Sequence, residues 1–249
     1  MTEEILNRLE QIERTYQVKI VYACESGSRA WGFESNDSDY DVRFIYVHHE
    51  DWYLSTFPKR DVIEEPINDL LDISGWELRK ALLLSYKSNP ALLEWMYSPT
   101  VYIEQEEFQI FRECALKSFK SIAAYHHYLS MVRSNINQIR EVNVRLKKYM
   151  YTLRPLLCAK WVIEKESQPP TVFEDLLEYY LPNGEIRNEI NELLHLKKDT
   201  NEVKTVRQNQ ILNQYIFTEF DEMVNAVPNI YERVEQDYDA VLRQLVRSA

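Results

Sequence analysis

Two aspartates lie two residues apart in the run Asp39-Tyr40-Asp41. Residues at positions i and i+2 of a strand point to the same face of a sheet, so the carboxylates of Asp39 and Asp41 are expected side by side while Tyr40 points the other way. Adjacent carboxylates repel each other unless a cation lies between them, and oxygen ligands of this kind suit Mg²⁺. This spacing therefore predicts a divalent metal site.

The pair Gly27-Ser28 precedes these aspartates, with ten residues between the two motifs. Glycine lets the backbone come close to a phosphate, and a helix that starts after it offers unpaired amide groups. The chain has only four glycines, so each is expected where the backbone geometry requires it. A phosphate-binding turn next to a metal site predicts a nucleotide site.

The order of these parts resembles the nucleotidyltransferases of the DNA polymerase beta superfamily, in which Gly-Ser or Gly-Gly is followed after a short interval by Asp-x-Asp or Asp-x-Glu. Ser26 departs from that pattern, which prefers an apolar residue there. A narrower resemblance, to the RNA-ligase-associated predicted nucleotidyltransferases (the RlaP family), spans roughly residues 18 to 165. The motifs that carry it are residues 27–45, 71–80, 88–95 and 147–157.

This resemblance implies an α+β chain with two domains. Residues 1–110 are expected to form a minimal nucleotidyltransferase fold with a small mixed β-sheet, and residues 111–249 an all-helical C-terminal domain. Apolar alternation predicts strands at 18–24, 39–47, 61–67, 70–74 and 101–103, and no strand after about residue 104. Helical periodicity predicts helices at 2–16 with Thr2 as N-cap, 30–33, 75–86, 91–97, 118–140, 143–166, 172–180, 185–199, 207–225 and 228–246.

The family pattern also calls for a third carboxylate from a neighbouring strand. The acidic candidates are Asp61, Glu64, Glu65, Asp69 and Asp72. We expect Asp72, because Leu71 and Ile73 would pack inward if Asp72 faced the cleft. Asp69 shares the face of these apolar residues, which counts against it. The alternative for Asp72 is a structural role as the N-cap of a helix starting near Gly75.

Two arginines flank the acidic motif. Arg43 lies two residues after Asp41 and so on the same face, where it can hold a phosphate or a carboxylate. Arg29 directly follows the Gly-Ser turn and can reach a phosphate. For each arginine the alternative is a structural salt bridge.

Residues 140–160 carry six basic side chains against the single acid Glu141. Helical spacing puts Lys147, Tyr151 and Arg154 on one face, with Lys148 next to them. The lysines and Arg154 are expected to reach the triphosphate or the acceptor, and Tyr151 to offer a stacking ring. The alternative is a charged face in contact with solvent.

Composition restricts the partners and the compartment. A net charge of −11 disfavours broad affinity for nucleic acid or for an anionic membrane. The three cysteines, Cys24, Cys114 and Cys158, are widely spaced and are expected to be buried, reduced thiols, which favours a cytoplasmic location. The sequence begins without a secretory signal pattern, and it contains no apolar run of about 18 residues that would span a bilayer.

The sequence therefore predicts a metal-dependent nucleotidyltransferase. A nucleoside triphosphate (NTP) is expected to bind with its β and γ phosphates near the Gly-Ser turn and Arg29, while two Mg²⁺ ions held by Asp39, Asp41 and Asp72 align an acceptor hydroxyl with the α-phosphate. An RNA end is the favoured acceptor, and a protein hydroxyl or a small molecule are alternatives. The competing hypothesis is a catalytically silent module that senses nucleotide or binds a partner. The sequence does not indicate the oligomeric state.

Overall fold

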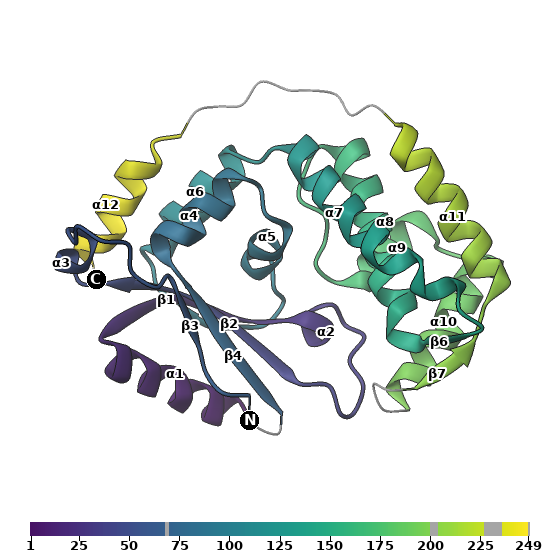
Figure 1. The fold of residues 1–249 in the computed structure, drawn as a ribbon, viewed down its shortest axis with the longest axis horizontal. Helices are drawn as coiled ribbons and strands as arrows, with labels where there is room; N and C mark the ends of the chain where they lie inside the picture. Colours follow the sequence, from purple (N-terminus) through teal and green to yellow (C-terminus); the bar gives the residue numbers. More distant parts are fainter. Residues whose placement is uncertain (68–69, 200–203, 227–235, 249) are drawn as a thin grey trace. The chain divides into compact units, whose positions relative to one another are not determined.

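The computed structural model describes residues 1–67, 70–199, 204–226 and 236–248. They form two compact units (Figure 1). Unit 1 contains the described residues of 1–30, 39–119 and 232–249, and unit 2 contains those of 31–38 and 120–231. Both units are discontinuous in sequence, whereas the domains expected from the sequence, 1–110 and 111–249, are continuous ranges.

Unit 1 is built on a five-stranded sheet with the order β3-β4-β2-β1-β5. The parallel neighbours are β2 and β4, and the other pairs are antiparallel. The strands are β1 (Val18–Ser26), β2 (Tyr40–His48), β3 (Val62–Glu64), β4 (Leu71–Glu77) and β5 (Val101–Glu104). This mixed sheet, with a helical second unit, confirms the expected α+β fold class.

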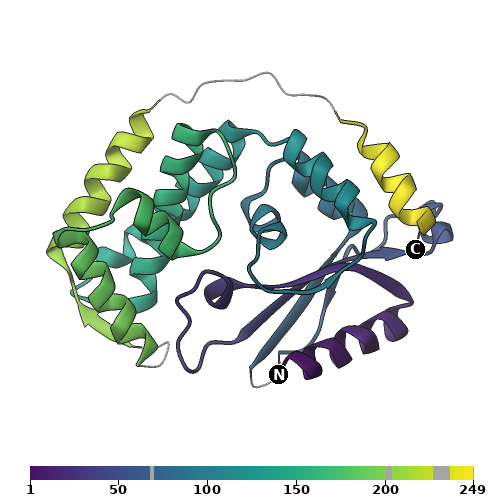
Figure 2. The same ribbon diagram turned by 180° about the vertical axis from the view of Figure 1, so that it is seen from behind.

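Helices cover both faces of the sheet (Figures 1 and 2). Helix α1 (Thr2–Tyr16) buries Ile5, Leu9 and Ile12 against one face, because these positions recur once per helical turn. The other face contacts α4 (Leu78–Tyr86), α5 (Pro90–Met96), α6 (Phe108–Lys117) and α12 (Tyr238–Ser248). Two short helices, α2 (Gly27–Ala30) and α3 (Glu50–Tyr53), flank β2 in the sequence.

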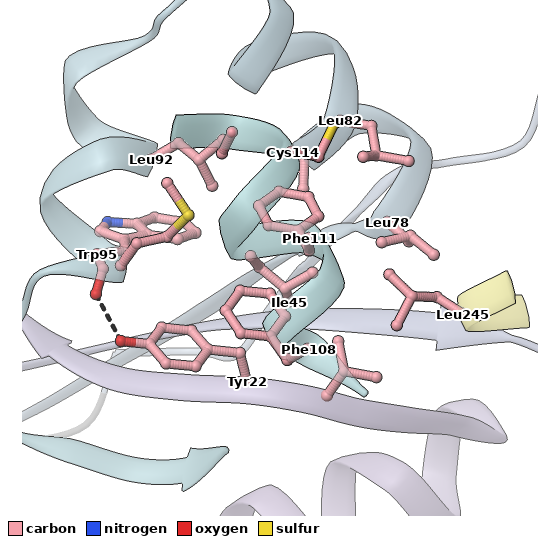
Figure 3. Close-up of a cluster of buried hydrophobic side chains, with 14 of the residues drawn as sticks. Tyr22, Ile45, Leu78, Leu82, Leu92, Trp95, Phe108, Phe111, Cys114 and Leu245 are labelled. Atoms are coloured by element: carbon pink, nitrogen blue, oxygen red, sulfur yellow. Dashed lines mark hydrogen bonds between the residues drawn. The ribbon is translucent and has the colours of Figure 1, made fainter. Parts of the chain in front are cut away.

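The second face of the sheet forms an aromatic core. Figure 3 shows Tyr22 and Ile45 of the sheet packed with Phe108 of α6, and Leu245 of α12 in the same cluster. The Tyr22 hydroxyl donates a 2.6 Å hydrogen bond to the Trp95 carbonyl, which satisfies the one polar atom that this ring buries. Helix α12, close to the end of the chain, is thereby part of the same core as the first strand.

The alternation of β2 decides where the functional side chains point. Val42 and Phe44 pack toward α1, whereas Ile45 packs in the core on the opposite face. Since successive side chains alternate between faces, Asp41 and Arg43 lie on the side of Ile45. This is the face covered by α4, α5 and α6.

Unit 2 is mostly helical. Its elements are α7 (Ser121–Ile136), the 3₁₀ helix η1 (Gln138–Arg140), β6 (Asn143–Arg145), α8 (Leu146–Lys165), α9 (Phe173–Tyr180), α10 (Glu185–Lys198), β7 (Thr205–Arg207) and α11 (Gln210–Asn225). Strands β6 and β7 pair as an antiparallel two-stranded sheet. The helix α8 continues through Pro155. Within the described ranges, no helix of either unit combines the length and the apolar character needed to cross a membrane.

Several boundaries in unit 1 differ from those expected. The helix predicted at 30–33 is instead α2, which follows β1 without a gap, and the N-cap of α1 is Met1 and not Thr2. The segment expected to begin a helix at Gly75 continues as strand β4 to Glu77, because Gly75 lies directly against the ring of Phe44. The strand at 61–67 shortens to β3, and α3 was not predicted.

The chain after residue 104 also contains elements that the sequence did not predict. The pair β6–β7 contradicts the expectation of no strand after residue 104, and each strand is only three residues long, too short for a recognisable alternation. Helix α6 was missed, and the helix predicted at 118–140 is α7 followed by η1. Of the helix predicted at 228–246, residues 228–235 lie outside the described residues, and α12 begins at Tyr238. All three cysteines are buried free thiols, as expected.

Candidate functional site

Asp41 and Asp72 are neighbours across the parallel strands β2 and β4, and Ser26 of β1 pairs with Asp41 on its other side. Leu71 and Ile73 are buried toward α1, so the alternation expected around Asp72 is present. The alternative role of Asp72 as a helix cap is wrong, because α4 is capped by Glu77. Two carboxylates thus lie side by side where β2 and β4 begin.

Arg43 bridges these two carboxylates. Its Nη2 is 2.9 Å from Asp41 Oδ1 and 2.7 Å from Asp72 Oδ2. Its Nη1 donates to the carbonyls of Asp72 at 2.8 Å and Val42 at 3.1 Å. Arg43 was expected to hold either a phosphate or a carboxylate, and in the structure it contacts two carboxylates. Its charge offsets the repulsion between two acids that the strand register forces together.

Gly27 makes room for this pair. The residue has φ of +61°, and a Cβ atom built on it would lie 2.0 Å from Asp41 Oδ2. Both the left-handed backbone and the close carboxylate require glycine at this position. The turn after β1 is therefore shaped directly against the first acid of the pair.

Glu25, a residue that the sequence analysis did not select, supports Asp41 from β1. Its side chain is only 2% exposed, and its Oε1 accepts a 2.8 Å hydrogen bond from the Asp41 amide. Its Oε2 accepts from the Tyr102 hydroxyl, and Ser98 Oγ donates to its carbonyl. Burial raises the pKa of Glu25. The one sequence signal was an acid at the end of an otherwise apolar strand.

The other residues of the motif lie around this pair. Asp39 is exposed and comes one residue before β2, outside the strand in which it was expected. The carbonyl of Asp39 accepts a 3.1 Å hydrogen bond from Arg29 Nε, and the guanidinium of Arg29 lies 3.8 Å from the centre of the Tyr40 ring. Ser28 is 5% exposed. The turn is thus ordered by backbone and ring contacts.

The four nucleotide-binding residues predicted in the helical half all belong to α8 of unit 2. Arg154 is 2% exposed and donates to the Thr171 carbonyl from Nε and Nη2, and its guanidinium lies 4.7 Å from the Trp31 ring centre. The ring of Tyr151 meets Trp31 edge-on, and Lys148 Nζ donates to Asn135 Oδ1 at 3.2 Å. Lys147 is half-buried. Their contact with a nucleotide stays a prediction.

The acidic pair suits a divalent cation in charge and ligand type. Both carboxylates already converge on one positive atom, Arg43 Nη2, and hard oxygen ligands are those that Mg²⁺ prefers. The described residues contain no group of three acidic, histidine or cysteine side chains placed to hold a metal. Asp41 and Asp72 therefore fit as two ligands, and Asp39 is not gathered with them in this arrangement.

Comparison with known proteins agrees with the motif. Residues 1–247 match the model of the family described as RNA repair pathway DNA polymerase beta family. The uncharacterized protein YcgL of Bacillus subtilis (strain 168) is 43% identical over 248 residues, which cover 99% of this chain and 95% of that protein. A solved nucleotidyltransferase-like protein from Exiguobacterium sibiricum 255-15 is 10% identical with a TM-score of 0.32, covering 88% of this chain and 78% of the other, a likeness too distant to carry weight.

Proposed function

The chain belongs to the RNA repair pathway DNA polymerase beta family, and from that premise we propose that it transfers a nucleoside monophosphate from an NTP to an acceptor hydroxyl, with an RNA end as the favoured acceptor. The observation that carries this proposal is the register of β2 and β4, which places Asp41 beside Asp72 next to the Gly27 turn.

Each residue of the site has a role in the proposed reaction. The backbone at Gly27 and Ser28 and the guanidinium of Arg29 bind the β and γ phosphates. Asp41 and Asp72, with Asp39 as a further ligand, would hold Mg²⁺, which supplies neutralisation of the charge that develops on the phosphoryl oxygens. Asp72, or a water next to it, takes the proton of the acceptor hydroxyl. The acceptor oxygen bonds to the α-phosphorus as the bond to the leaving pyrophosphate breaks.

A second candidate function is nucleotide sensing without catalysis. The observation in its favour is Arg43, which compensates the acidic pair within the chain itself. A site balanced in this way is stable without metal and could bind an NTP through the turn alone. Calorimetric titration separates the two functions, because a silent sensor binds NTP equally well with and without Mg²⁺.

The proposal is tested by incubating the protein with each α-labelled NTP, Mg²⁺ and total cellular RNA and protein, then asking which fraction carries label. Asp41→Asn and Asp72→Asn keep the side-chain shape but remove a charge, and each should lower transfer by about three powers of ten if several kcal/mol of charge stabilisation are lost. Asp51→Asn, at an aspartate whose side chain is 88% exposed, is the matched control. Full activity in both site variants would overturn the proposal.

A further inference from the structure

A second candidate site lies in unit 1, away from the acidic pair. A cavity of about 380 Å³ is lined by residues between 52 and 61, by Glu77, and by the first turns of α4. The cavity lies where β2 and β4 end, whereas Asp41 and Asp72 lie where these strands begin. Figure 1 shows the same separation, with α3, which lines the cavity, and α2, which contains Gly27, at opposite ends of the sheet. The seven steps along β2 from Asp41 to His48 span roughly 23 Å at about 3.3 Å per residue.

The floor of this cavity is rigid. The Tyr53 hydroxyl donates a 2.7 Å hydrogen bond to Glu77 Oε1 and accepts one of 3.4 Å from the His48 amide. Glu77 Oε2 accepts from the amides of Arg79 and Lys80, so both carboxylate oxygens are used. Glu77 is 1% exposed. These hydrogen bonds fix the positions of Tyr53 and Glu77 at the floor of the cavity.

The rim of the cavity is basic in a chain of net charge −11. Lys59, Arg79 and Lys80 line it, together with the acids Asp61 and Glu77. Lys80 is paired with Asp61 at 3.0 Å, and Glu77 is engaged by the floor network. The two other cations lie near rings, with Lys59 Nζ 5.5 Å from the Trp52 centre and Arg79 Cζ 5.3 Å from that of Tyr53. The lining therefore holds three cations against two acids, and this excess of positive charge can attract an anion into the cavity.

Exposed aromatic surface lies next to these cations. Phe57 lines the cavity with 78% of its surface exposed, so its ring is accessible to a ligand. Trp52, which also lines it, is held in place by stacking on His48, with ring centres 4.3 Å apart. A base that stacks on an exposed ring while its phosphate meets basic side chains is the usual way in which proteins bind single-stranded nucleic acid.

We propose that this cavity binds a nucleobase and its adjoining phosphate, with the base on Phe57 and the phosphate between Lys59 and Arg79. This chemistry occurs both in a free mononucleotide and in a single-stranded RNA. The choice of RNA as the ligand rests on the proposed function. An RNA strand bound in this cavity would extend along the sheet, so that its reacting end lies at Asp41 and Asp72. The site is separate from the one proposed for the NTP.

The test measures binding of the full-length protein, without NTP or Mg²⁺, to a fluorescent single-stranded oligoribonucleotide and to AMP. Phe57→Ala should weaken binding about 5- to 150-fold, the range for losing one stacked base. Lys59→Ala combined with Arg79→Ala should weaken it and make the dependence of log K on log salt shallower by about one. Leu54→Ala and Lys87→Ala are matched controls, since both residues are exposed and neither lines the cavity.

Competition distinguishes the two sources of the ligand. If AMP displaces the oligonucleotide and binds with the same sensitivity to Phe57→Ala, the cavity recognises a mononucleotide unit. If only the oligonucleotide binds and only the cavity variants weaken it, the ligand is a strand. Failure of both probes to bind, or cavity variants that bind like the controls, would overturn the inference. Either result is independent of transfer activity, which is measured separately with labelled NTP.

Discussion

At the scale of single residues, Gly27 is the position where backbone geometry and chemistry meet. Gly27→Ala would place a methyl group on Asp41 Oδ2 and strain a φ of +61°, so we expect Asp41 to move and transfer activity to fall at least tenfold. Gly184→Ala is the control, because Gly184 also has positive φ, +103°, but no atom within 4 Å of the new Cβ. Both variants strain a positive φ and should lose about 1–3 kcal/mol of stability, with the larger loss in Gly27→Ala because of its contact with Asp41, and only Gly27→Ala should lose activity.

Arg43 provides a prediction about metal binding that does not depend on activity. In Arg43→Gln the carboxylates of Asp41 and Asp72 lose their shared cation, which should lower the free energy of unfolding at neutral pH by about 1–2 kcal/mol. Mg²⁺ should restore part of this loss in a urea titration, since the vacated position now favours a divalent cation. Arg60→Gln, which breaks an exposed pair with Glu64, should change little in either condition. Equal Mg²⁺ effects in both variants would contradict this account.

At the scale of secondary-structure elements, the sequence was most informative where a pattern was long. The alternation around Asp72 and the helix α1 were both predicted because their apolar residues recur over several positions. The position at which β4 ends was not predicted, because the residue that keeps Gly75 in the sheet lies on another strand. Gly75 remains in the sheet since its β2 partner, Phe44, occupies the space where a side chain would be. No local pattern contains that contact.

This packing of Phe44 on Gly75 predicts a coupling between two strands. A Cβ on residue 75 would lie 2.2 Å from Phe44 Cε2, so Gly75→Ala should destabilise unit 1 by about 1–3 kcal/mol through overpacking. Phe44→Leu should cost about 1–2 kcal/mol alone, by leaving space. The double variant should be less destabilised than the sum of both, by at least 0.5 kcal/mol in urea unfolding. Strict additivity would show that the two residues do not share this space.

At the scale of the whole molecule, the candidate site could be predicted only in part. The Gly27 turn, Asp41 and Asp72 were identified from spacing and resemblance, and the structure brings them together. Glu25 was missed because its importance comes from Tyr102, on a strand far away in the sequence. The segment 31–38, which joins the Gly27 turn to the acidic motif, belongs to unit 2, although the residues on both sides of it belong to unit 1. No change in composition marks where the chain passes from one unit to the other. Long-range packing, which a single sequence does not display, decides these features.

The stability of the whole chain should also depend on pH through His48. Burial, with a smaller effect of nearby Lys59, lowers the pKa of His48 from 6.5 to about 4. Between these values the unfolded chain binds a proton that the folded chain does not, so this part of the stability is present above pH 6.5 and is lost as the pH falls toward 4. The loss should be about 1 kcal/mol, since solvent screens a half-buried side chain. The measurement compares the free energy of unfolding in urea above pH 6.5 with that at a pH halfway between 6.5 and 4. The wild type and the control His49→Phe, which replaces an exposed histidine, should both lose stability at the lower pH. His48→Phe should not, because it keeps a ring against Trp52 but has no group that titrates.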